Sequence, residues 1–382
     1  MKMKKIMALA LTAAMTVSLS AAFAQADDTF KIGAIGPTTG PAAQYGSAVV
    51  NGAQVAVDEI NEAGGIGGAL IEYKGEDDEL DNEKSINAYN SLKDSINMQI
   101  LVGPTTSGCT IAVAEKTKED NMFQITPSGS SQDCTKYDNV FRVCFSDPAQ
   151  GEKSAEYIAD KQLGTKIGII YDSSDTYSAG IEAAFEAKAA EVQLEVAVKE
   201  AFTADSNTDF TAQLQKCKDA GVDLIFLPIY YTQAGTILTQ AYSMGLDVQF
   251  LGCDGLDGML AMDNFQKELA EGVIFLTPFD SNAEDELTQN FVKKYQEAYG
   301  ETPNQFAADA YDAVYAVKVA CEEAGVTPDM ETSDICEALK KAFTEINIDG
   351  VTGAGMHWTP EGEPEKLPKF MLIKDGAYVP AD

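Results

Sequence analysis

Four loops of this 382-residue chain combine hydroxyl side chains with glycine in a way that could bind a polar ligand. Each follows an apolar run typical of a strand, and together they comprise residues 37–46, 103–108, 126–131 and 252–255. Taken singly, each loop is more simply explained as a helix cap or a turn, where serine, threonine and glycine are common. Taken together they favour a ligand site, because ligands of doubly wound sheets bind beyond the carboxyl ends of the strands.

The sequence lacks the usual catalytic and cofactor-binding patterns. Gly33 and Gly36 do not have the spacing of a dinucleotide fingerprint, and neither a phosphate-binding lysine loop nor a Gly-x-Ser-x-Gly turn occurs. The single histidine, His357, makes serine-triad and multi-histidine metal chemistry implausible. Adjacent carboxylates such as Asp77 and Asp78 indicate only a solvated face in so acidic a chain. We therefore expect no catalytic residue, no metal site and no cofactor, and we rank an enzyme last.

The charge balance excludes other classes of function. The chain has 60 acidic and 27 basic residues and a formal net charge of −33. Such a surface repels nucleic acid and anionic lipid, so we expect no nucleic-acid partner.

The first 24 residues resemble an export signal. Lys2, Lys4 and Lys5 precede an apolar segment at 6–19, and residues 22–24 have the small-x-small pattern of a cleavage site. No cysteine follows the apolar segment, so we expect no lipid anchor there, and a soluble extracytoplasmic protein starting near Gln25. The seven cysteines are expected to be mostly buried thiols, with room for one or two disulfides.

Strand-like and helix-like segments alternate along the rest of the chain. Strands are expected at 30–36, 70–74, 99–103, 122–126, 166–171, 194–198, 223–227, 248–252 and 273–276, and short strands at the C-terminus. Helices are expected at 44–62, 82–94, 107–120, 177–190, 209–220, 232–244, 285–299, 305–323 and 333–343. This alternation predicts an α/β fold of mostly parallel sheets. The two series, before and after about Ser146, predict two lobes.

Several of these segments resemble the leucine/isoleucine/valine-binding protein family, the extracytoplasmic receptors of branched-chain amino acid ABC importers. The resemblance begins with Gly36-Pro-x-x-Gly-Pro-x-x-Gln-Tyr-Gly46 and continues through 52–67, 77–78, 103–108, 125–130, 141–143 and 249–255. It implies a type I periplasmic-binding fold: two doubly wound lobes, joined by three crossover segments, with the ligand in the cleft. We expect one lobe to comprise 25–145 and 279–352, and the other 146–278 and 353–382.

The resemblance also implies a set of ligand-binding residues. Tyr45 corresponds to the loop tyrosine that packs over the ligand, and Asp254 to the acid that pairs with the α-ammonium. The donors for the α-carboxylate and the second-lobe aromatics correspond to Thr105, Ser107, Ser128, Ser130, Tyr177 and Tyr230. The family commonly has glutamate at the position of Asp254, and it often has cysteines where this chain has Leu80 and Thr106.

The chemistry of these residues suits a zwitterion. Ser107 at a helix start offers a hydroxyl, backbone N–H groups and the positive end of the helix dipole, and Asp254 offers a negative charge. Together with what the resemblance implies, this chemistry leads us to expect a monomeric receptor that captures an amino acid, most simply a branched-chain one, and delivers it to a membrane permease. The alternatives are a receptor of the same fold for an aromatic acid, an amide or urea, or a short peptide, and a ligand-sensing ectodomain.

Overall fold

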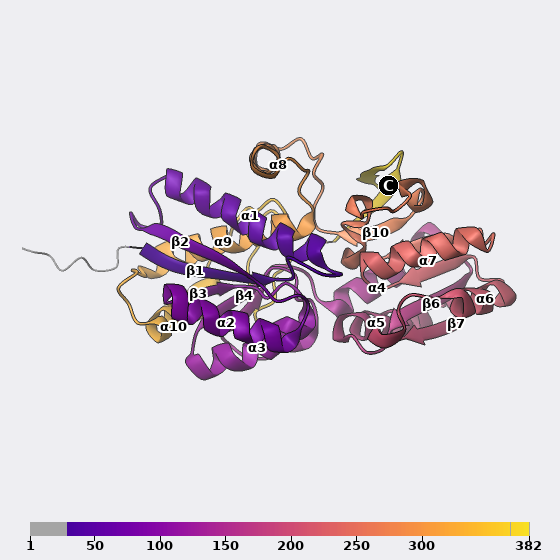
Figure 1. The fold of residues 1–382 in the computed structure, drawn as a ribbon, viewed down its shortest axis with the longest axis horizontal. Helices are drawn as coiled ribbons and strands as arrows, with labels where there is room; N and C mark the ends of the chain where they lie inside the picture. Colours follow the sequence, from indigo (N-terminus) through magenta and orange to yellow (C-terminus); the bar gives the residue numbers. More distant parts are fainter. Residues whose placement is uncertain (1–28, 367, 382) are drawn as a thin grey trace, which may run out of the picture.

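The computed structural model describes residues 29–366 and 368–381, which form two α/β lobes lying side by side (Figure 1). The expected export signal at 1–24 lies outside the described residues. Within the described part of the chain, no helix combines the length and the apolar character that a membrane span requires.

The first lobe is built on a parallel five-stranded sheet in the order β2-β1-β3-β4-β5. Its strands are β1 (Thr29–Gly36), β2 (Leu70–Asp77), β3 (Ile100–Val102), β4 (Phe123–Thr126) and β5 (Val140–Arg142). The inner strands are buried on both faces, which is why they read as unbroken apolar runs. The helices that connect these strands are α1 (Ala43–Glu62), α2 (Asn82–Ile96) and α3 (Ser107–Asp120).

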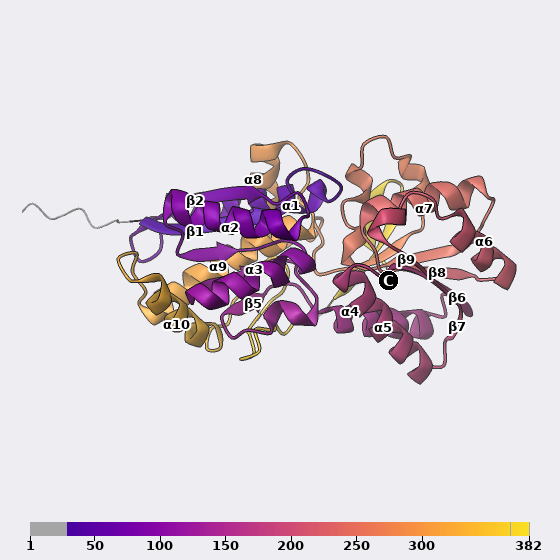
Figure 2. The same cartoon turned by 60° about the horizontal axis from the view of Figure 1, so that its bottom comes forward.

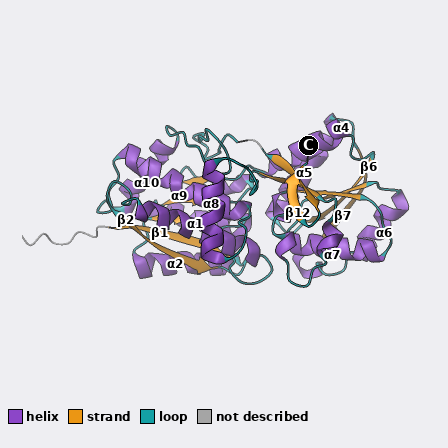
Figure 3. Ribbon diagram, turned by 90° about the horizontal axis from the view of Figure 1, so that it is seen from above, coloured by secondary structure: helices purple, strands orange, loops and turns teal. Residues whose placement is uncertain are grey.

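The second lobe contains a seven-stranded sheet in the order β12-β11-β10-β9-β8-β6-β7. Its strands are β6 (Lys166–Asp172), β7 (Glu195–Phe202), β8 (Leu224–Leu227), β9 (Gln249–Gly252), β10 (Ile274–Thr277), β11 (Lys369–Lys374) and β12 (Ala377–Pro380). The pairs β10–β11 and β11–β12 are antiparallel and the remaining pairs are parallel. The helices are α4 (Asp147–Lys161), α5 (Thr176–Glu191), α6 (Thr211–Ala220) and α7 (Tyr231–Ser243). Figures 2 and 3 show helices on both sides of the strands in this lobe.

Three further helices return the chain to the first lobe: α8 (Glu286–Tyr299), α9 (Gln305–Ala324) and α10 (Thr332–Phe343). Helix α9 packs so closely on α1 that a Cβ added to Gly52 would lie 2.1 Å from the carbonyl oxygen of Ala307. The alanines of α9 and Gly52 therefore fix the start of α9, where Gln305 and Phe306 lie, against the N-terminal half of α1.

The chain passes between the sheets after β5, after β10 and between α10 and β11. A buried ion pair connects the first and third of these crossings to α9. Lys366 Nζ donates to Asp309 Oδ1 at 2.9 Å, to Val143 O at 2.9 Å and to Thr352 Oγ1 at 2.8 Å. Because both charged side chains are at most 2% exposed, each depends on the other for its electrostatic partner.

Removing only one partner of this pair is expected to be costly. Lys366→Ala should lower the free energy of unfolding by about 3–5 kcal/mol, because it leaves the Asp309 carboxylate buried without a cation. The double variant Lys366→Met with Asp309→Leu should lose much less. Urea unfolding of both variants tests this, and an equal or greater loss in the double variant would contradict it.

Most expected elements are confirmed, but the sequence analysis missed strand β5 and helix α4. The expected strand at 194–198 is also too short, since β7 runs to Phe202. The disulfides that the sequence allowed are absent: all seven cysteines are buried free thiols.

Candidate functional site

The loops beyond the carboxyl ends of the parallel strands meet between the lobes and line a small cavity. Seven of the eight predicted site residues line this cavity; Ser130 does not. The lining residues are Tyr45, Thr105, Thr106, Ser107, Ser128, Tyr177, Tyr230, Asp254, Gly255 and Phe306. The free space inside this cavity is small, because the loops of the two lobes are in contact over it.

Hydroxyl groups bind the first-lobe loops to one another. Ser107 Oγ accepts hydrogen bonds from the backbone N–H groups of Ser130 and Ser131, both at 3.1 Å. Ser128 Oγ donates to Thr105 O at 2.6 Å, and Thr105 Oγ1 donates to Ile35 O at 3.3 Å. The hydroxyls of Thr105 and Ser128 therefore hold the loops together, whereas Ser107 retains its hydroxyl proton for a ligand.

Thr106 adds a group that the sequence analysis did not place in the site. It is the N-cap residue of α3, it is 5% exposed, and its Oγ1 has no hydrogen-bond partner among the described residues. The N–H groups in the first turn of α3 have no acceptor within their own helix, and the helix dipole is positive there. This wall of the cavity is suited to a carboxylate.

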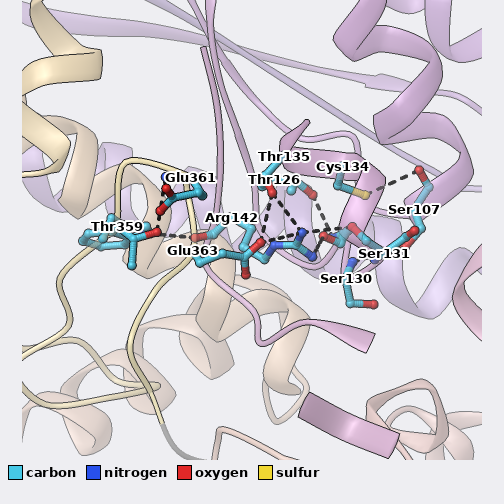
Figure 4. A network of polar contacts seen from close by, with 12 residues as sticks. Ser107, Thr126, Ser130, Ser131, Cys134, Thr135, Arg142, Thr359, Glu361 and Glu363 are labelled. Atoms are coloured by element: carbon cyan, nitrogen blue, oxygen red, sulfur yellow. Dashed lines mark hydrogen bonds and ion pairs between the residues drawn. The ribbon is translucent and has the colours of Figure 1, made fainter. Parts of the chain in front are cut away.

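Arg142, the one arginine of the chain, lies beside the loop of Ser130 and Ser131, which Ser107 also contacts (Figure 4). Its fully buried guanidinium donates to Gly129 O at 3.0 Å and to Ser131 O at 2.9 Å, and it pairs with Glu363 Oε1 at 2.9 Å. Because it bonds backbone on both sides of Ser130, Arg142 fixes the shape of the loop that Ser107 also holds.

Aromatic side chains join the lobes over the cavity. The Tyr45 ring from α1 lies 5.3 Å from that of Tyr230, 5.0 Å from that of Tyr231 and 4.2 Å from that of Phe306. Tyr45 Oη donates to Gly255 O at 2.5 Å and accepts from the backbone N–H of Tyr231 at 3.2 Å. Tyr45 therefore connects first-lobe α1 to two segments of the second lobe.

Asp254 places a carboxyl group in the second-lobe wall of the cavity. The residue is 4% exposed, its Oδ1 accepts a hydrogen bond from Tyr177 Oη at 2.7 Å, and none of its described neighbours forms an ion pair with it. Burial raises the pKa of Asp254 to about 7, although the hydrogen bond from Tyr177 opposes this shift. A cationic group of a ligand would supply the missing partner.

Two glutamines hold the backbone of Asp254 in place. Gln150 Oε1 accepts from the backbone N–H of Asp254 at 3.1 Å, and Gln305 Nε2 donates to its carbonyl oxygen at 2.7 Å. Gln150 belongs to α4 in the second lobe and Gln305 to α9 in the first. The position of Asp254 therefore depends on both lobes.

A larger space, open to solvent, adjoins the cavity between the lobes. The two share Thr106 and Tyr230, and the larger space is also lined by apolar residues that include Pro41, Leu80 and Ile229. The side chain of a ligand bound between Thr106 and Asp254 has room to extend there.

Sequence reasoning missed Thr106, Gly255 and Phe306 as lining residues. Thr106 and Gly255 lie in loops that were recognised, so an inspection of every loop position would have found them. Phe306 follows no sheet strand, and no local sequence signal marked it.

Across residues 29–366 and 368–381, no group of three or more histidine, cysteine or carboxylate side chains could hold a metal ion.

Two α/β lobes with convergent loops and a polar cavity between them define a solute-binding protein of the hinged type. A model of the family described as "Periplasmic binding protein" matches residues 29–376, and the chain belongs to this family. Its members are receptors, not enzymes, which confirms the expectation from the sequence.

Named relatives bind branched-chain amino acids. The Leucine-, isoleucine-, valine-, threonine-, and alanine-binding protein of Pseudomonas aeruginosa is 30% identical over 86% of this chain and 87% of its own length. The LivJ substrate-binding protein of Streptococcus pneumoniae, solved in complex with isoleucine, is 31% identical with a TM-score of 0.83, covering 92% of this chain and 97% of that chain. The leucine-binding protein LivK of Thermotoga maritima is 26% identical with a TM-score of 0.82, covering 93% and 98%.

Proposed function

We propose that this protein is the extracytoplasmic receptor of an ABC importer, and that it captures an α-amino acid between its lobes. Asp254 carries the proposal: a buried carboxyl without a cation faces a cavity whose opposite wall offers hydrogen-bond donors. An α-ammonium would pair with Asp254, and an α-carboxylate would lie against Ser107, Thr106 and the start of α3. The named relatives favour a branched-chain side chain directed into the adjoining space.

A receptor for simple aromatic acids fits the site less well. Such a ligand has an anionic group but no ammonium, so Asp254 would remain buried without a cationic partner. Amides and short peptides remain alternatives, and the ligand screen described below should include both.

Lobe closure would make the site functional. Tyr45, Tyr230 and Gln305 make contacts between the two lobes. A ligand that touches both lobes binds the closed form more tightly than the open form, and so it stabilises the closed form. We propose that this form is delivered to a membrane permease, which then takes up the amino acid. A total of about 8 kcal/mol accompanies micromolar binding, enough to offset a modest preference for the open form.

A ligand screen tests the function directly. Leucine, isoleucine and valine should raise the melting temperature of the mature chain, because they bind only the folded state. Saturating leucine should also decrease the radius of gyration measured by small-angle scattering. A screen in which no amino acid raises the melting temperature, while an aromatic acid or an amide does, would overturn the proposal.

Ligand affinity should depend on pH. Burial between the closed lobes raises the pKa of Asp254 to about 7, and only its carboxylate form pairs with an ammonium. Affinity should therefore increase as the pH rises through 7, and be weaker at pH 6 than at pH 8 by about tenfold. Calorimetry between these pH values checks this, and a flat profile would contradict it.

We further propose that residues 1–24 are removed on export, that the mature protein is a soluble monomer without a lipid anchor, and that it has no nucleic-acid partner. We propose lobe boundaries at 145/146 and 278/279. For the third crossing, the contacts of Trp358, Gly362 and Glu363 with Arg142 favour a boundary near 366 instead of 352.

A further inference from the structure

The larger space that adjoins the amino-acid cavity has a mostly polar lining with a small apolar part. Its carboxylate and amide residues include Asp172, Asp175 and Asn82. Among the residues described in this lining, the branched aliphatic ones are Leu80 from the first lobe and Ile229 from the second. Ile229 is 1% exposed and offers almost no surface to a ligand, whereas Leu80 is partly exposed. Leu80 is therefore the branched aliphatic side chain best placed to contact an occupant of this space.

The backbone of Leu80 has a conformation that leucine rarely adopts. Leu80 has a φ of +62° and the preceding Glu79 a φ of +51°, so both lie in the left-handed region. This region is unfavourable for a large apolar residue, because its Cβ crowds the following carbonyl oxygen, and glycine or asparagine usually occupies it. A turn that only joined β2 to α2 would form at lower cost with one of these two residues. Residues held in such conformations cluster at binding and active sites.

Two aspartates at the end of β2 hold this turn in place. Asp77 Oδ1 accepts hydrogen bonds from the backbone N–H groups of Glu79 and Thr38, both at 2.9 Å. Asp78 is fully buried, and its Oδ1 accepts from the backbone N–H of Leu80 at 3.0 Å. These bonds offset the unfavourable backbone conformation. They also fix the turn against the loop after β1, which lines the same space.

The turn is also joined to the wall that we assign to the ligand carboxylate. The Asp78 carboxyl that holds Leu80 accepts a hydrogen bond from the Cys109 thiol in the first turn of α3. Thr106, at the start of the same helix, lines both the amino-acid cavity and the larger space. A ligand anchored at Thr106 and Asp254 therefore extends its side chain into the space that Leu80 lines.

We propose that Leu80 is a specificity-determining residue: its side chain contacts the aliphatic end of the bound amino acid and favours leucine over alanine. This inference rests on the proposed function, and it adds the residue that selects the ligand side chain. The contact removes apolar surface of leucine from water, which stabilises the complex. Alanine has only a methyl group and gains little from it.

The test compares leucine with alanine by calorimetry on the mature protein and on Leu80→Asn. Asparagine tolerates the left-handed backbone and replaces the apolar end of the side chain with an amide. Leucine affinity should fall by about tenfold, the loss expected when roughly two methylene groups lose their apolar contact. Alanine affinity should change by less than about twofold, because the groups that bind its carboxylate and ammonium are unchanged.

Two further variants separate the apolar contact from effects on the turn. Leu80→Met keeps an apolar side chain of similar volume on the same backbone, so it should retain leucine affinity within about twofold. Glu79→Asn makes the same replacement at the preceding left-handed residue, whose exposed side chain pairs with Lys84 outside the larger space. This matched control should bind leucine normally.

The inference is overturned if Leu80→Asn binds leucine normally, or if leucine and alanine lose affinity for it by the same factor. The second result would mean that Leu80 only supports the turn. Either result leaves the receptor function standing, because leucine still binds the unsubstituted protein. If leucine does not bind the unsubstituted protein, the amino-acid proposal itself fails, and the role of Leu80 fails with it.

Discussion

Replacing Asp254 with asparagine is expected to weaken the binding of an α-amino acid by roughly 100-fold or more, which corresponds to about 2.7 kcal/mol. The substitution keeps the shape of the side chain and the hydrogen bond from Tyr177 Oη, but removes the negative charge. The ligand ammonium would then be desolvated in a cavity without a counter-charge, which costs several kcal/mol. Since Asp254 is 4% exposed, solvent screens this loss very little.

The measurement is calorimetry with leucine and with 4-methylpentanoate, which lacks the α-amino group. Asp254→Asn should lose affinity for leucine and lose none for the analogue. Asp247→Asn, which removes an exposed carboxylate outside the site, is the matched control and should bind leucine normally. If Asp254→Asn binds both ligands as the unsubstituted protein does, the ammonium assignment is wrong.

The two lobes and most elements could be predicted because strands buried on both faces are short apolar runs with clear ends. Helix α4 has no such signal. Its buried positions include Gln150, Gly151 and Ser154, so it lacks an apolar stripe. These residues are suited to close contact with α5, where a Cβ on Gly151 would lie 2.5 Å from Ile181 O. Strand β7 was underestimated for a related reason: it lies at a sheet edge, and Lys199 and Glu200 interrupt the apolar run in its second half.

The site was predictable to the extent that it follows the strand ends. The loops after β1, β3, β4 and β9 all reach the cavity, as the topology requires. Local sequence could not show which hydroxyls remain free. Ser130 was expected to contact the ligand, yet its backbone is held by Ser107 and its side chain is outside the cavity lining. Phe306 enters the site only because α9 packs on α1, a contact between segments about 260 residues apart.

Tyr45→Ala is expected to have an effect of similar size, through closure and not through charge. Its ring is 1% exposed and contacts Tyr230 and Tyr231 of the second lobe, so truncation removes apolar contact that only the closed form makes. Truncating a buried aromatic side chain costs about 3–5 kcal/mol. Because the truncation destabilises the closed form more than the open form, it lowers ligand affinity. We expect affinity to fall by about 100-fold.

Tyr45→Phe separates the ring from its hydroxyl. It keeps the aromatic contacts but leaves Gly255 O and the Tyr231 N–H without their partner, so affinity should fall by about tenfold. Small-angle scattering at saturating leucine should show that Tyr45→Ala is less compact than the unsubstituted protein. Tyr242→Ala removes a tyrosine that is 72% exposed on α7, and should alter neither affinity nor compaction. Normal leucine affinity in Tyr45→Ala would mean that the contact between Tyr45 and the second lobe does not contribute to closure, and that the site closes by Gln305 and its neighbours alone.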